Sequence, residues 1–136
     1  MTTRRATVED IPKFAEYMQG NLERNHFDPE VLAYPTTRVM AIEDDGDPAL
    51  FVPYTLTLSL DSMAPKPGLS SPKKALALRE LLTTVIGIAD QSGIGEIHFQ
   101  SDDEPTIEFA QNHGFEVLEM KTLRLKPRNF RAKKVR

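Results

Sequence analysis

The sequence predicts a single α/β (α+β) domain with a mixed, mainly antiparallel sheet of six to seven strands and helices on both faces of the sheet. Two observations predict it. Segments in which apolar and polar residues alternate are interspersed along the chain with segments whose apolar residues recur at helical spacing. A long helical segment, residues 71–91, lies between two strand segments, and a connection of that length joins parallel strands.

The N-terminal quarter of the chain predicts one strand and two helices. Residues 2–6 form the strand, and Thr7 caps the helix that follows it. Asp10 stands three residues after Thr7, where its carboxylate can reach back to the cap as in a capping box. A second short helix over residues 28–34 begins with an Asp cap and a proline at its first position.

A hairpin is predicted next. Residues 38–43 form its first strand, and the Asp-Gly pair within residues 44–47 supplies the positive φ angles of a tight turn. The returning chain is interpreted as two strands, 49–53 and 56–63, since Pro53 cannot donate to a strand ladder. One long bent strand is the alternative, and this choice accounts for the range of six to seven strands.

The second half of the chain predicts two helices and three strands. The long helix begins with Ser71 as its cap and Pro72 at its first position, and it ends at a Ser-Gly pair. The remaining elements are a strand at 96–100, a helix from 101 to 113, and two final strands at 115–120 and 121–126.

Charge is distributed unevenly along the chain. Residues 1–120 carry 9 Lys and Arg against 20 Asp and Glu, a net charge of −11, whereas residues 121–136 carry 8 basic residues and no acid. We therefore expect a domain over residues 1–127 and a flexible basic tail over 128–136, which could dock on the acidic body of its own or a neighbouring chain. The acidic body disfavours nucleic acid as a partner.

Several classes of protein are disfavoured by composition. The chain has no cysteine, so disulfides, thiol catalysis and cysteine-bound metal are excluded. The N-terminal residues do not read as a signal peptide, and no apolar run is long enough to span a membrane. No two histidines have metal-ligand spacing, so no metal site is expected. We expect a cytoplasmic protein.

Four segments in this order resemble the GNAT superfamily of N-acetyltransferases. Residues 5–12 look like the opening strand and first helix of that family, and the Asp-Gly hairpin stands where the family has its first β-turn. Ala64, which prolines follow, looks like the end of the central strand before the cofactor loop. Residues 109–115, ending in Gly-Phe, look like the closing segment of the family. The resemblance covers about residues 2–126.

The resemblance implies acetyl-CoA or another acyl-CoA as cofactor. In the family the pantetheine arm runs along the end of the central strand, and the pyrophosphate binds backbone N–H groups at the start of the long helix. The corresponding residues here are Ser62, Met63 and Ala64 for the arm, and Ser71, Lys73, Lys74 and Ala75 for the pyrophosphate. The family loop has glycine where this chain has Lys73, and Pro72 removes one donor. Two lysines in this turn favour a phosphate group instead.

The catalytic residues implied by the resemblance are only partly present. The tyrosine with which the family often protonates the departing thiolate corresponds to Ala110 here. The family often uses a Glu or a held water as base for the amine. Alternation places Asp61 on the polar row of the central strand, and His98 with Glu96 and Gln100 on that of the next strand. Asp61 and His98 are the candidate bases.

These observations predict an N-acyltransferase that transfers an acetyl group from acyl-CoA to an amine of a small molecule or a protein, and a homodimer is an open expectation. The alternative is a catalytically inactive protein of the same fold that serves in binding or assembly, because the loop lacks its glycines and Ala110 replaces the tyrosine. A weaker alternative is a nucleic-acid-associated protein that binds through its basic tail.

Overall fold

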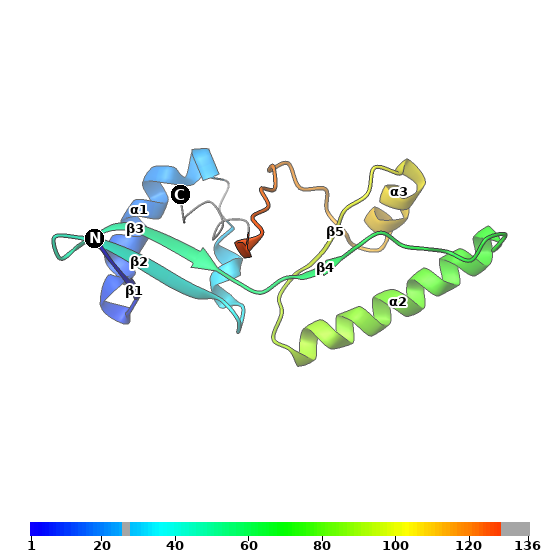
Figure 1. Cartoon of the computed structure of the whole chain (residues 1–136), viewed down its shortest axis with the longest axis horizontal. Coiled ribbons are helices and arrows are strands. Elements are labelled where there is room, and N and C mark those ends of the chain that lie inside the picture. Colours follow the sequence, from blue (N-terminus) through cyan, green and yellow to red (C-terminus); the bar gives the residue numbers. More distant parts are fainter. Residues whose placement is uncertain (26–27, 129–136) are drawn as a thin grey trace. The chain divides into compact units, whose positions relative to one another are not determined.

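The computed structural model describes residues 1–25 and 28–128 (Figure 1). The chain divides into two compact units, Met1–Asp102 and Asp103–Arg136, and each unit is described by itself. The first unit contains β1 (Thr2–Arg5), the 3-10 helix η1 (Val8–Asp10), α1 (Ile11–Asn25), the 3-10 helix η2 (Pro29–Ala33), β2 (Arg38–Asp44), β3 (Asp47–Tyr54), β4 (Leu58–Leu60), α2 (Ser71–Gln91) and β5 (Ile97–Phe99). The second unit contains α3 (Glu104–Asn112). From β1 to α3, the order of helices and strands is the one predicted from the sequence.

Strands β1, β2 and β3 form an antiparallel sheet in that order (Figure 1). The hairpin between β2 and β3 turns at Asp45 and Gly46, whose φ angles are 51° and 84°, as a tight two-residue turn requires. Pro53 lies within β3, an edge strand of this sheet, where its missing N–H is tolerated. Residues 49–63 therefore contain two strands, as predicted, but the break falls at residues 55–57 rather than at the proline.

Helix α1 packs on this sheet through a cluster of aromatic rings. The ring of Phe51 on β3 lies 5.5 Å from the ring of Phe14 and 5.5 Å from that of Tyr17. Phe51 is 9% exposed and Ala41 beside it on β2 is fully buried. The neighbour of Phe51 along the strand, Leu50, points to the other face and is 56% exposed. The core of this sheet is thus on the α1 side.

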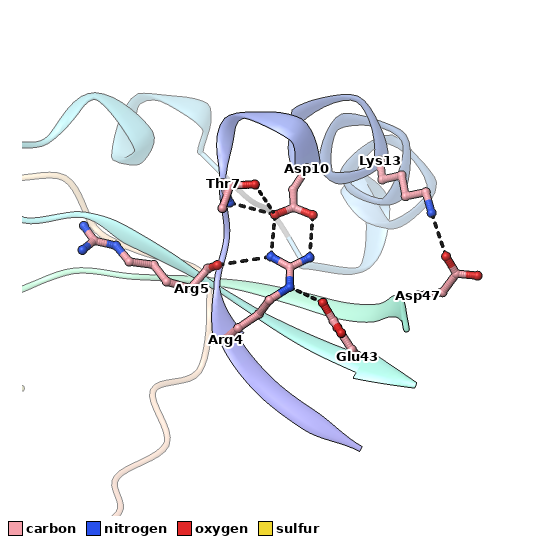
Figure 2. A network of polar contacts seen from close by, with 7 residues as sticks. All are labelled: Arg4, Arg5, Thr7, Asp10, Lys13, Glu43 and Asp47. Carbon is pink, nitrogen blue, oxygen red and sulfur yellow. Dashed lines mark hydrogen bonds and ion pairs between the residues drawn. The ribbon is translucent and has the colours of Figure 1, made fainter. Parts of the chain in front are cut away.

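An ion-pair network joins β1 to η1 and β2 (Figure 2). Arg4 donates from Nη1 and Nη2 to the two oxygens of Asp10 at 2.7 and 2.8 Å, and from Nε to Glu43. Asp10 also accepts the backbone N–H of Thr7 at 2.7 Å, as the predicted capping box requires. Hydrogen bonds from Arg4 and from the Thr7 backbone hold the pKa of the Asp10 carboxyl well below its usual range.

Strands β4 and β5 form a second, parallel pair, and α2 is the connection between them (Figure 1). This is the parallel pair that the length of the helical segment predicted. Helix α2 ends at Gln91, and Gly93 follows it with a φ of 69°, which lets the N–H of Ile94 bond back to the carbonyl of Ala89 at 2.9 Å. Among the residues that the structure describes, no helix is both long and apolar enough to cross a membrane.

In the second unit, α3 has a side-chain cap at its N-terminal end and a glycine after its C-terminal end. The Asp103 carboxylate accepts the N–H of Thr106 at 3.2 Å, and Gly114 follows the helix with a φ of 97°. The last turn is closed by hydrogen bonds from His113 and Phe115 to the carbonyl of Ala110, both at 3.0 Å.

The two final strands predicted from the sequence are not formed. Residues 115–126 contain no strand, so the described part of the chain has five strands rather than six to seven. Alternation marks a segment as able to join a sheet, but a strand exists only where a ladder partner is present. The apolar side chains of this segment, such as Leu123 at 93% and Leu125 at 65%, are exposed. Residues 129–136 of the predicted tail lie outside the described residues.

Candidate functional site

The parallel β4–β5 pair has one polar and one apolar face. Ser59 on β4 lies in register with His98 on β5, and paired residues of parallel strands point to the same side. The residues that alternate with them are all apolar: Leu58 and Leu60 on β4, Ile97 and Phe99 on β5. The apolar face explains why these two short strands pair, and the polar face is where a soluble reactant can approach.

His98 has a carboxylate partner two residues earlier, directly before its strand. The distance from His98 Nε2 to Glu96 Oε1 is 3.0 Å, and the two side chains are 41% and 35% exposed. Residues two apart in a strand share a face, so the predicted placement of Glu96 beside His98 is what the structure shows. The imidazole is therefore half-buried and held through Nε2, and among the described residues Nδ1 has no hydrogen-bond partner, so it can meet a reactant.

Asp61, the other candidate base, is not paired with His98. β4 ends at Leu60, so the predicted strand over residues 56–63 is shorter and Asp61 is an exposed residue just beyond it. The residue directly opposite His98 is Ser59. If β4 continued straight, Asp61 would face Gln100, with its Cα about 8 Å from that of His98. The ladder stops because residues 61–64 lead into the loop before α2.

Tyr34 is a third side chain at this site that the sequence did not indicate. It follows η2, and its ring packs against Gly95, where a Cβ would overlap the ring atoms. Burial, and then a hydrogen bond to the Glu96 carboxylate, raise the pKa of the Tyr34 hydroxyl. Glu96 thus lies within hydrogen-bond distance of His98 and next to the glycine on which Tyr34 packs. The available signal was the glycine immediately before Glu96, which marks a close approach of another group.

Residues 62–64 lie beyond the β4–β5 ladder. Ser62, Met63 and Ala64 are all exposed, and Met63 is 38% exposed. No strand pairs with these residues within the described part of the chain. Their backbone N–H and C=O groups are therefore suited to pair with an amide-bearing chain such as pantetheine.

The start of α2 differs by one residue from the prediction. Ser70, not Ser71, occupies the cap position; Ser71 is the first helical residue and Pro72 the second. The Ser70 carbonyl accepts the N–H of Lys74 at 2.9 Å, so the helix hydrogen bonds begin one residue earlier than a Ser71 cap allows. The capping signal was ambiguous because two serines precede the proline.

This helix start fits a phosphate group in part. The Ser70 side chain makes no cap hydrogen bond, so no side chain of that residue occupies the first-turn N–H groups of Ser71 and Lys73. Lys73 and Lys74 are exposed in the same turn, and Ala75 is half-buried. Two N–H groups, two ammonium groups and the positive end of the helix dipole attract an anion. Pro72 contributes no donor.

Ala110, which stands where the resemblance places a tyrosine, is buried at 8% exposure on α3. A methyl group cannot donate a proton, so α3 supplies no acid from that position.

Comparisons with known proteins give the following. No family model and no curated protein matches the sequence. Among solved structures, the chain is similar to one described as a probable acetyltransferase, at 15% identity and a TM-score of 0.41, over 93% of this chain and 97% of that one. It is similar to AAC(6')-Iy, determined with the bisubstrate analogue CoA-S-monomethyl-acetylneamine, at 17% identity and a TM-score of 0.40, over 92% and 97% of the two chains.

A third similar structure is a predicted acetyltransferase from Clostridium acetobutylicum determined with acetyl-CoA, at 13% identity and a TM-score of 0.39, over 94% of this chain and 97% of that one. All three are described as acetyltransferases, the activity that the sequence resemblance implies.

Proposed function

We propose that the chain is a GNAT-like N-acyltransferase that transfers an acetyl group from acyl-CoA to an amine. The observation that supports this most is the polar face of the β4–β5 pair. This face holds the imidazole of His98 on β5 with its carboxylate partner Glu96. The other strand of the pair, β4, leads through a loop into the start of α2. The reaction needs both a base and an anion site, and residues 61–70 link β4 to the anion-attracting start of α2.

In this proposal acyl-CoA, when bound, supplies an activated acetyl thioester. Backbone groups of residues 62–64 receive the pantetheine arm, and the N–H and ammonium groups of Ser71, Lys73 and Lys74 receive the pyrophosphate, with Ala75 leaving room for it. His98 Nδ1 accepts the proton that the amine loses as a C–N bond forms and the C–S bond breaks. The electron pair leaves with sulfur, and the thiolate takes a proton from solvent. Asp61 is the alternative base.

The charge of the chain favours a cationic amine as acceptor. Residues 1–120 carry a net charge of −11, and Asp61 and Glu96 are carboxylates on or next to the proposed site. A field of this sign raises the local concentration of cations and speeds their association. The acceptor is therefore expected to be a small molecule or a protein side chain with a protonated amine that loses its proton on binding.

The alternative is a protein of this fold that binds acyl-CoA or a partner without catalysis. Two observations favour it: Lys73 stands where the family has glycine, and Ala110 is a buried methyl group where the family has a phenol. Under this alternative CoA can still bind at the start of α2, but the protein transfers no acetyl group from the thioester to an amine.

Calorimetric titration of acetyl-CoA and CoA into the protein, at low and at moderate salt, tests the binding step. We expect one-to-one binding that weakens with salt and that falls about tenfold or more in a Lys73→Ala/Lys74→Ala variant, a loss of about 1.4 kcal/mol or more. Arg79→Ala is the matched control, because Arg79 is an exposed cation on α2 beyond its first turns. Equal affinity for all three proteins rejects the phosphate site.

Release of CoA thiol in the presence of amines tests the transfer step. The chain contains no cysteine, so a thiol reagent reads CoA alone. We expect amine-dependent release that falls about 10²–10⁴-fold in His98→Ala, the range for loss of a general base. Binding of CoA without release for any amine in a broad panel supports the non-catalytic alternative.

A further inference from the structure

The contact between His98 and Glu96 fixes which imidazole nitrogen carries a proton. An ionised carboxylate is only an acceptor of hydrogen bonds, so the nitrogen 3.0 Å from it must be the donor. That nitrogen is Nε2, and the neutral ring then has its lone pair on Nδ1. Without such a partner the two tautomers of an imidazole interconvert, and a ring whose proton sits on Nδ1 cannot accept another at that nitrogen.

A second side chain, from a distant part of the chain, lies near the same carboxylate. Tyr34 follows η2, and its ring packs on Gly95, the residue before Glu96, which itself directly precedes β5. The ring of Tyr34 is held in turn, because it packs on Gly95 and no side chain occupies that position. With a pKa raised by burial and by the neighbouring carboxylate, the Tyr34 hydroxyl keeps its proton and remains a donor at neutral pH.

We propose that Glu96 is the positioning residue of His98, holding it as the Nε2–H tautomer with Nδ1 free to accept a proton, and that Tyr34 keeps Glu96 in this position. A carboxylate has room for both donors, since it offers about four lone-pair sites. The inference rests on the proposed function only for the source of the proton that Nδ1 accepts. Glu96 acts through His98 and does not contact the acetyl group or the amine.

The arrangement has two consequences for a base. It removes the fraction of imidazole that would carry its proton on Nδ1, and it places a negative charge beside the imidazolium that forms when Nδ1 is protonated. Ser59, opposite His98, is a hydroxyl that can donate to or accept from a reactant on the same face, but it carries no charge. Glu96 is therefore the group that decides the state of the ring.

Nitrogen-15 spectra of the histidine rings in the full chain test this without any CoA. At about pH 8 a free imidazole is neutral, and long-range proton–nitrogen correlations distinguish the two tautomers. His98→Gln assigns the signal by removing it. We expect wild-type His98 to be the Nε2–H tautomer alone, and Glu96→Ala to move the Nδ1 and Nε2 shifts toward each other, as an exchanging mixture does.

His113 is the internal control. Its Nδ1 lies 2.8 Å from the carbonyl oxygen of Phe109, which can only accept, so His113 is expected as the opposite tautomer, with Nδ1–H, in every variant. If Glu96→Ala does not fold, Tyr34→Phe serves instead, because it removes one hydroxyl and keeps the ring on Gly95. We expect a smaller movement of the His98 shifts in the same direction.

Identical His98 shifts in the wild type, Glu96→Ala and Tyr34→Phe would overturn the proposal, as would an Nδ1–H tautomer in the wild type. Either result leaves the binding and transfer experiments to decide the acyltransferase activity. Conversely, a protein that does not bind CoA but shows the expected tautomer keeps the positioning role of Glu96 and loses only the source of the proton.

Discussion

Replacing Phe51 with alanine removes the side chain that joins α1 to the three-stranded sheet. The ring of Phe51 meets that of Phe14 edge-on, at 76° between ring planes, and that of Tyr17 at 48°, each with centroids 5.5 Å apart. It is 9% exposed. Truncation therefore removes buried apolar surface and two aromatic contacts at once.

The expected cost follows from these contacts. Buried Phe→Ala substitutions cost about 3–5 kcal/mol, and aromatic pairs contribute about 0.5–1.5 kcal/mol each beyond their buried area. We expect about 3 kcal/mol, toward the lower end, because α1 can relax toward the space that is left. A domain with a total stability of about 5–15 kcal/mol remains folded, but with a much reduced margin.

Urea unfolding followed through the backbone amide signals of β2 and β3 measures this cost. With a slope of about 1.5–2 kcal/mol/M for a small domain, the midpoint should fall by about 1.5–2 M. Leu50→Ala is the matched control, because Leu50 is the next residue on the same strand and is 56% exposed on the other face. It should change the free energy of unfolding by about 0.5 kcal/mol or less. Equal shifts for both variants, or less than about 1 kcal/mol for Phe51→Ala, would refute the assignment of the core to the α1 face.

Two further predictions concern the network of Arg4 and the packing of Tyr34. The Arg4 guanidinium lowers the pKa of Asp10, so the stability that this ion pair contributes is present above about pH 4 and is lost as the pH falls further. Asp10→Asn should therefore lower the melting temperature at neutral pH, and the difference in melting temperature from wild type should shrink in acid. A difference that stays constant with pH would contradict the ion pair. Gly95→Ala places a methyl group into the ring of Tyr34 and should lower the free energy of unfolding by about 1–3 kcal/mol. Adding Tyr34→Ala to the same chain should relieve the overlap. Strictly additive effects of the two substitutions in urea unfolding would argue against the contact.

The sequence predicted best those elements whose signals are local. The Asp45-Gly46 turn and the Asp28 cap each depend on a few adjacent residues, and each forms as expected. The long crossover between β4 and β5 was predicted from length alone. These features require no knowledge of the rest of the fold.

The errors come from features that depend on distant residues. Alternation over residues 115–126 predicted two strands, but a ladder needs a partner that the pattern does not name. In α1, a stripe at helical spacing through Phe14 would include Ile11, yet Ile11 is 57% exposed and Tyr17 meets Phe51 instead. Spacing gives the direction of a stripe to within about one residue, and the sheet decides which side is covered.

The candidate site shows the same division. Alternation correctly put His98 and Glu96 on one face of a strand, because that is a local property. It could not give the register of β4 against β5, which puts Ser59 rather than Asp61 opposite His98. Nor could it show that Tyr34 packs on Gly95, beside Glu96, since Tyr34 and Gly95 are far apart in the chain.

The short ladder between β4 and β5 has a consequence for the protection of backbone amides from exchange with solvent. β2 and β3 are paired over seven positions and β1 and β2 over four, whereas β4 and β5 are paired over only three. Segments with fewer rungs open at a lower free energy than the global unfolding of the protein. Deuterium should therefore enter β5 well before β2, so the strand that carries His98 can detach transiently while the antiparallel sheet stays intact.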